Sequence, residues 1–180
     1  QGGVSLLPRL SLNSASYQLD QASVSGRKTY NRTVPTFSLD ASAVFERPTR
    51  IFNQDLVQTL EPRIRYVRTP YVNQTDIPLF DSAERDFNQY SIYSDNVYTG
   101  VDRISDANQV TLGMTSRMFR ADTGIEAMRL GMVQKVLLSD QRINPESDQP
   151  LTQELSDMLL LGSASIFPNW SLDGAVQLSR

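Results

Sequence analysis

Charged side chains follow a regular pattern in this sequence, and they are the first candidates for chemistry. Six segments (37–45, 56–66, 110–118, 128–138, 158–166 and 170–178) carry the pattern. The charges inside them are Asp40, Glu61, Arg63, Arg65, Arg117, Arg129, Lys135 and Asp173. All eight occupy the positions that alternate with the apolar residues, an outcome with a chance of roughly one in a few hundred. They therefore predict one polar face that holds charges of both signs.

The residue types present exclude several kinds of chemistry. The 180 residues contain no His and no Cys, so a Ser-His or Cys-His nucleophile and a thiolate or imidazole metal site cannot form among them. Lys and Arg number 17 against 20 Asp and Glu, which argues against a broad basic surface for nucleic acid. We expect no enzyme, no catalytic residue, no cofactor, no metal site and no nucleic-acid partner in this chain.

Strands are the elements expected to position these charges. Apolar residues recur at every second position, as at Leu112 and Met114, which is the period of a β-strand. A further strand is expected near 10–20, before a polar stretch at 21–32, and a bulge is expected at Pro62 because proline lacks the ladder donor. We expect turns at 46–55, 121–125 and 167–169, and long outer loops at 67–107 and 139–157.

Two folds have alternating strands with one charge-free face. In a soluble β-sandwich the apolar face packs on a second sheet, whereas in an outer-membrane barrel it faces lipid. Segments of 9 to 11 residues favour the barrel, because a strand that crosses the hydrocarbon layer needs about that length. A lipid-facing Arg or Lys costs about 2–4 kcal/mol at mid-depth, which explains the charge-free parity.

The predicted fold is therefore all-β: an antiparallel transmembrane β-barrel segment, with about six to eight strands of a larger outer-membrane barrel. Residues 1–180 are expected to be part of a single barrel domain. A closed barrel leaves no unpaired strand edge in lipid. We therefore expect further strands outside these residues to complete it, and we do not expect the segment to fold alone.

Several long strings resemble one protein family. They read VFER at 44–47, TLEPRIRY at 59–66, PYVNQTDIPLFDS at 70–82 and YTGVDRISDANQVTLGMTSRMF at 98–119. These strings are similar to the LptD family of lipopolysaccharide-assembly proteins, also called OstA or Imp. The resemblance is specific from about residue 33 to residue 118. Beyond residue 118 only the regular succession of β-hairpins is similar.

Membership would imply a translocon in the cell outer membrane of a Gram-negative bacterium, which inserts lipopolysaccharide into the outer leaflet. It would imply a lipoprotein partner, LptE, as a plug in the barrel. It would also imply a periplasmic Lpt bridge that docks on a domain outside these residues. The alternatives are a general porin or adhesin barrel, an outer-membrane hydrolase whose site lies in other strands, and a soluble β-sandwich binding module.

The eight charges then have two readings. They form either a polar lumen wall for a phosphorylated headgroup or the plug, or a set of mutual pairs that keeps the lumen hydrated. Within the loop 67–107, the resemblance singles out Asp102 and Arg103 as candidates for locking the loop to the lumen wall through charge-assisted hydrogen bonds. The acids of this loop do not follow the spacing of an EF-hand, so the sequence predicts no calcium site of that type.

Overall fold

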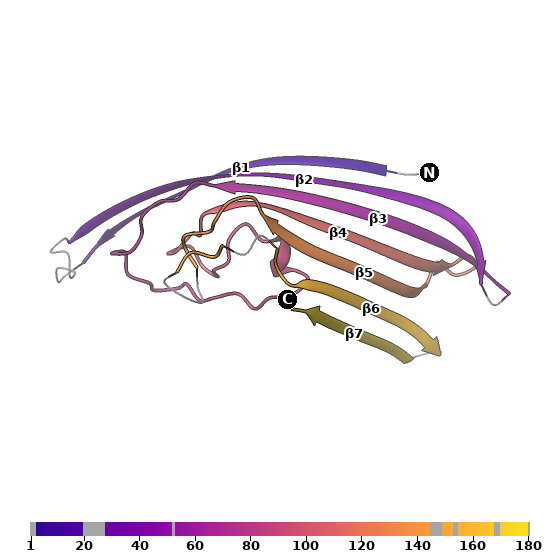
Figure 1. Ribbon diagram of the computed structural model, residues 1–180. Helices are drawn as coiled ribbons and strands as arrows, with labels where there is room; N and C mark the ends of the chain where they lie inside the picture. The colour runs from indigo at the N-terminus through magenta and orange to yellow at the C-terminus, as the bar shows by residue number, and fades with distance from the viewer. Residues whose placement is uncertain are drawn as a thin grey trace.

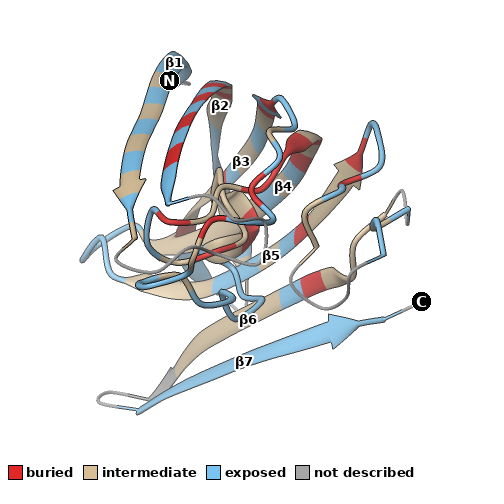
Figure 2. Ribbon diagram, turned by 90° about the vertical axis from the view of Figure 1, so that its left-hand side faces the viewer, coloured by how far each residue is buried: buried red, intermediate tan, exposed pale blue. Residues whose placement is uncertain are grey.

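A single antiparallel sheet forms the protein. The computed structural model describes residues 3–19, 28–51, 53–144, 149–152, 155–167 and 170–179. The strands are β1 (Gly3–Gln18), β2 (Thr29–Ile51), β3 (Gln54–Thr69), β4 (Ala107–Arg120), β5 (Glu126–Leu137), β6 (Met158–Phe167) and β7 (Trp170–Leu178). Each strand pairs with its neighbours in chain order, from β1 to β7. The sheet is curved, and the long connection between β3 and β4 lies on its concave side (Figures 1 and 2).

The predicted strands are confirmed, and several are longer than predicted. β2 has 23 residues and β3 has 16, against segments of nine and eleven in the prediction. The strand expected near 10–20 is β1, which begins at Gly3. β2 begins at Thr29, inside the polar stretch expected at 21–32, of which 21–27 lie outside the described residues. The turn at 121–125 is confirmed, and of the turn at 167–169 residues 168 and 169 lie outside the described part.

The turn predicted over 46–55 is in the right place but is much shorter than predicted. Cross-strand pairs between β2 and β3 continue to Ile51 and Gln54, and Pro48 is paired with Val57. The left-handed φ of 64° at Asn53 lets the chain reverse direction in a much shorter connection.

The bulge predicted at Pro62 is absent. Pro62 pairs with Met114 in an unbroken register between β3 and β4. On the other side the β2–β3 register is the same before and after Pro62, although no partners are assigned to it there. The missing donor is thus accommodated by a local gap in pairing. A register shift occurs instead between β4 and β5, next to Met118.

The two faces of the sheet are inverted relative to a water-soluble protein. Leu112, Leu130 and Leu172 lie on the convex face and are 45%, 49% and 63% exposed. The concave face instead buries polar side chains, including Arg32 and Thr111. Bands of buried and exposed residues alternate along β2, and bands of intermediate and exposed residues alternate along β1 (Figure 2). This is the distribution predicted for the wall of an antiparallel membrane barrel, and a second sheet over the apolar face, as in a sandwich, is not seen in the described residues.

The described residues include no helix with the length and apolar content needed to span a membrane. A single 3-10 turn, η1 (Ser91–Tyr93), lies in the connection between β3 and β4. The connection itself covers residues 70–106, and that between β5 and β6 covers 138–157. Of the second, 145–148 and 153–154 lie outside the described residues.

Candidate functional site: the inner wall and the loop packed against it

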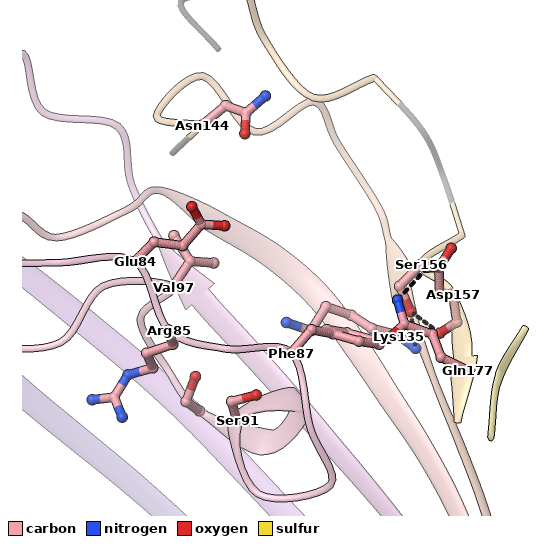
Figure 3. Close-up of a pocket in the computed structure, with 11 residues that line it drawn as sticks. Glu84, Arg85, Phe87, Ser91, Val97, Lys135, Asn144, Ser156, Asp157 and Gln177 are labelled. Atoms are coloured by element: carbon pink, nitrogen blue, oxygen red, sulfur yellow. Dashed lines mark hydrogen bonds between the residues drawn. The ribbon is translucent and has the colours of Figure 1, made fainter. Parts of the chain in front are cut away.

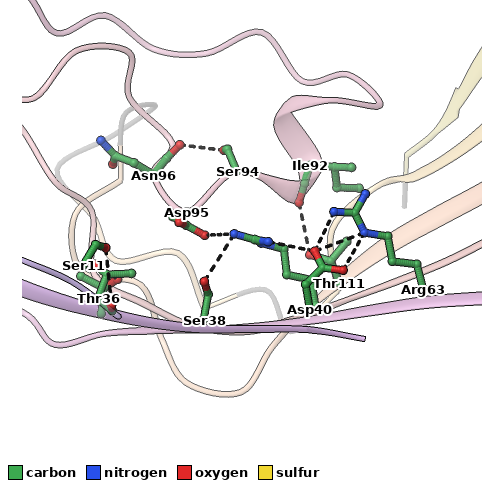
Figure 4. Close-up of polar contacts among 12 residues, drawn as sticks. Ser11, Thr36, Ser38, Asp40, Arg63, Ile92, Ser94, Asp95, Asn96 and Thr111 are labelled. Atoms are coloured by element: carbon green, nitrogen blue, oxygen red, sulfur yellow. Dashed lines mark hydrogen bonds and ion pairs between the residues drawn. The ribbon is translucent and has the colours of Figure 1, made fainter. Parts of the chain in front are cut away.

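An ion-pair network joins the inner wall to the first long loop. Arg63 and Arg65 of β3 both contact Asp40 of β2, with Nη2 of Arg63 at 2.6 Å and Nη1 of Arg65 at 2.9 Å from Oδ2. Nη2 of Arg65 lies 2.5 Å from Oδ1 of Asp95, which belongs to the loop (Figure 4). Alternate residues of a strand share a face, and so Arg63 and Arg65 can both reach the acid on the neighbouring strand. Three of the predicted wall residues therefore form one cluster with a loop carboxylate.

The 3-10 turn η1 anchors the same loop with apolar contacts. Ile92 is fully buried and packs against Val133 and Leu159 of β5 and β6. The hydroxyl of Thr111 donates to the Ile92 carbonyl at 3.2 Å (Figure 4). The sequence did not predict this contact, because the apolar residues of this irregular loop follow no strand or helix period. It shows that the loop is packed onto the inner wall over part of its length.

Tyr93 continues the anchor toward the ion-pair network. The Arg63 guanidinium lies 4.2 Å from the centroid of the Tyr93 ring, a cation–π geometry. Burial raises the pKa of the Tyr93 hydroxyl, although the nearby Arg63 charge opposes the shift. A Cβ added at Gly113 would lie 1.8 Å from the Tyr93 hydroxyl oxygen, so only glycine leaves room for the ring at this point of β4.

A second ion-pair cluster lies further along the wall, toward the short turns. Arg117 lies 3.4 Å from Glu61 and 3.8 Å from Glu126, measured between nitrogen and oxygen atoms. Arg129 contacts Glu126 at 2.8 Å. Glu126 was not among the predicted residues, because it precedes the predicted segment 128–138, and the alternation of β5 would point it to the other face. The register shift beside Met118 brings it to the inner side.

Lys135 and Asp173 stand apart from these clusters. Lys135 lines a cavity of about 310 Å³ together with Glu84, Phe87 and Asp157, and Figure 3 shows these residues converging from the loops and β5. Asp173 of β7 lines a hollow that also contains Arg129. In the described part of the chain, neither residue has an ion-pair partner within 4.0 Å. The eight predicted residues are thus brought into two clusters and two separate positions.

Asp102, a predicted loop-lock residue, accepts three hydrogen bonds. Its Oδ1 accepts from the Tyr17 hydroxyl of β1 at 3.0 Å, and its Oδ2 accepts from the amides of Phe80 and Asp81 at 2.8 and 2.7 Å. Burial alone would raise the pKa of Asp102, but these donors outweigh it and hold the pKa below its ordinary value. The carboxylate therefore connects two parts of the loop to the first strand.

Arg103, the other predicted loop-lock residue, contributes less. Its Nη2 donates to the Gln74 carbonyl at 3.4 Å, and its backbone amide donates to Ser82 at 3.1 Å. Both partners belong to the same loop. In contrast to Asp102, Arg103 makes no hydrogen bond or ion pair with the strands in the described residues. It faces a cavity between the two long loops.

Arg32 of β2 takes the place that the sequence suggested for Arg103. It is 2% exposed and donates to the Asp102 carbonyl, to the Val101 carbonyl at 2.5 Å and to Gln74 Oε1 at 2.7 Å. It also donates to Asn13 Oδ1 on β1 at 2.5 Å. Its position has the same parity as Asp40, so the alternation could have identified it. Arg32 was not predicted because it was assigned to the polar stretch 21–32, whereas β2 begins at Thr29.

The arrangement is a polar wall with an ordered loop fixed to it. Among the described residues, no group of three or more acidic side chains could hold a metal ion. The charges on the wall are mostly satisfied by one another, which favours the reading in which they pair and keep the interior polar. What remains open to a passing molecule is a hollow of about 560 Å³ lined by Arg9, Glu61, Arg63 and Arg117, among others.

Comparison with known proteins decides the family. The model of the family described as "LptD: LPS transport system D" matches residues 1–180. The chain belongs to the LptD family. This confirms the resemblance of the strings at 44–47, 59–66, 70–82 and 98–119, and extends it over the C-terminal hairpins.

Relatives of the LptD family agree with this assignment. The LPS-assembly protein LptD of Acidovorax sp. (strain JS42) is 45% identical over 172 residues, which are 96% of this chain and 21% of the relative. The protein of the same name from Polaromonas sp. (strain JS666) is 44% identical over 172 residues, again 96% and 21%. That from Paracidovorax citrulli is 42% identical over 173 residues, 96% and 21%. The chain spans about a fifth of the length of these relatives.

Proposed function

We propose that this chain forms part of the barrel wall of an outer-membrane translocon that inserts lipopolysaccharide into the outer leaflet of a Gram-negative bacterium. Its relatives are named LPS-assembly proteins, and its convex face suits lipid contact. Its role is transport without covalent chemistry. The single observation that carries the proposal is the inverted sheet, with apolar side chains outward and paired charges inward, in a chain of this family.

The inner wall supplies a polar surface beside the route of the lipid's headgroup. Arg63 is 43% exposed at its side chain while paired with Asp40, so its guanidinium offers further donors to a phosphate. Arg117, at 35%, does the same lower on the wall. The acyl chains do not match this polar face, so in the proposal the wall guides the headgroup.

The protein's partners follow from the same proposal. The lipoprotein LptE would plug the barrel from the concave side, against the surface that the loop 70–106 leaves uncovered. The periplasmic Lpt bridge would deliver lipid through a domain outside these residues. The bilayer would contact the convex face, where Leu112 and Leu130 are exposed.

Site-specific photocrosslinking in the full-length protein tests the proposal. A photoreactive amino acid is placed at Thr115, which lines the inner hollow, or at Leu112 on the convex face. We expect lipopolysaccharide adducts at Thr115 that depend on energised transport, and none with that dependence at Leu112. Equal adducts at both positions, or none at Thr115 during active export, would refute the transport role.

A charge reversal gives a second test. The double variant Arg63→Glu, Arg65→Glu places two more acids beside Asp40 and removes the partner of Asp95. We expect weaker plug binding or reduced export of lipopolysaccharide. The matched control is Arg47→Glu, an exposed β2 arginine whose contact is with Gln58. Normal assembly and normal surface lipopolysaccharide in the double variant would contradict the role of this wall.

A further inference from the structure

The two long loops are fastened to each other next to a basic cavity. The Asp106 carboxylate accepts hydrogen bonds from the backbone amides of Arg142 and Ile143, at 2.9 and 2.8 Å. An isolated bridge between Gln141 and Leu151 stiffens the second loop at the same place. Both loops lie at the end of the sheet where β3 stops and β4 begins. The Arg142 backbone is therefore held in a set position against the first loop.

A cavity of about 400 Å³ lies between the loops at this contact. Its described lining is Tyr71, Gln74, Thr75, Arg103, Arg142, Ile143 and Asn144. None of these residues is acidic, and two are arginines. This differs from the cavity at Lys135, whose lining includes both Glu84 and Asp157.

Among the described residues, neither guanidinium group of the cavity is paired with a carboxylate. Arg142 lies over the ring of Tyr71, 5.1 Å from its centroid, and Arg103 makes one hydrogen bond of 3.4 Å to the Gln74 carbonyl. In the described part of the chain neither has an ion pair within 4.0 Å, whereas Arg63, Arg65, Arg117 and Arg129 on the inner wall all have one. A guanidinium carries five N–H donors, and most donors of both groups have no partner among the described residues.

We propose that this cavity binds a phosphate group, and that the bound phosphate holds the loop 138–157 to the loop 70–106. Two arginines can each present a pair of donors to one tetrahedral, doubly charged group. A single carboxylate has fewer oxygens and a smaller charge to share between them. The stacking of Arg142 on Tyr71 and the fixed Asp106 contact place one donor set in advance, which lowers the entropy cost of binding.

The phosphate has two possible sources, a lipid headgroup and free phosphate ion. Both offer the same chemistry to the two arginines. The site concerns the outer loops and not the inner wall, so phosphate binding does not depend on the proposed transport role. Phosphate binding is measured on purified protein, and export of lipopolysaccharide is measured separately. A failure of the phosphate site can therefore be distinguished from a failure of the proposed transport role.

Hydrogen exchange of the full-length protein in detergent tests the site. The probes are inorganic phosphate alone, micelles of a phosphorylated glycolipid, and micelles of the same glycolipid after enzymatic dephosphorylation. We expect phosphate-containing probes to slow exchange in the segments 70–76 and 139–144. The variants Arg103→Gln and Arg142→Gln should each weaken the apparent affinity at least tenfold, while Arg103→Lys and Arg142→Lys, which keep the charge, should weaken it less.

Arg85→Gln is the matched control. Arg85 belongs to the same loop, and its Nε donates to the Tyr98 carbonyl outside this cavity. Protection by the phosphorylated glycolipid alone would support the site with a lipid headgroup as ligand, and protection by inorganic phosphate as well would support a general phosphate site. No protection by either, or equal loss of affinity in Arg85→Gln, would overturn the proposal.

Discussion

Replacing Asp102 by Ala tests how the first loop is held to the wall. The change removes the acceptor of three hydrogen bonds, from the Tyr17 hydroxyl and from the amides of Phe80 and Asp81. A hydrogen bond to a charged group contributes roughly 1.5–3 kcal/mol, so three at the low end give about 4.5 kcal/mol of local stability. That corresponds to about a thousandfold change in the opening equilibrium of the loop.

Amide hydrogen exchange in the full-length protein measures this change directly. We expect the protection factors of the Phe80 and Asp81 amides to fall by two to three orders of magnitude. The fall can be smaller than the full thousandfold because water solvates the freed donors. Asp102→Asn keeps an oxygen acceptor, so its loss should be about tenfold, the worth of the charge alone. Asp76→Ala is the control, since Asp76 is an exposed acid of the same loop. Unchanged protection in Asp102→Ala would refute the reasoning.

Acid should weaken the same contact without any substitution. Because the pKa of Asp102 is lowered in the folded loop, its stabilising contribution is complete above the ordinary value of about 3.9 and is lost as pH falls through the lowered value. After correction for intrinsic exchange, protection of the Phe80 and Asp81 amides should be flat from neutral pH to about pH 5 and decrease below pH 4. The decrease should be absent in Asp102→Ala; the same decrease there would assign it to another group.

Two further predictions concern the wall itself. Gly113→Ala should displace the Tyr93 ring, because the new Cβ would lie 1.8 Å from its hydroxyl oxygen, and proteolysis of the loop should become faster. Adding Tyr93→Phe, which removes that oxygen, should partly reverse the effect. Gly174→Ala is the control, because its Cβ would have no atom within 4 Å, and it should have no effect. A loop equally resistant in Gly113→Ala would contradict that packing. Leu130→Arg on the convex face should lower barrel assembly yield, because a lipid-facing Arg destabilises a barrel by about 2–4 kcal/mol. Ser163→Arg on the inner face should leave the yield unchanged. Assembly is measured as heat-modifiable protein in the outer membrane, and equal yields would argue against lipid contact at Leu130.

The alternation of charges and apolar residues was enough to predict the strands and their two faces. Asp40 and Arg63 lie on one face of the sheet and Leu112 on the other, as the alternation predicts, because successive side chains of a strand point to opposite faces. The prediction of the face fails where the alternation of a strand is interrupted. Glu126 reaches the inner wall through a register shift, and a shift of one residue depends on the partner strand.

The loop contacts were decided by the tertiary structure. Arg32 and Asp102 are 70 residues apart, and Ile92 meets Val133 and Leu159 on strands that follow it in the chain. Such pairs have no period in the sequence, since their positions depend on how the whole sheet curves around the loop. The chain by itself thus determined the face of most strand residues, because side chains alternate along a strand and lipid penalises charges on one face. Folding determined which charges meet, because only the assembled wall brings distant donors and acceptors within hydrogen-bond distance.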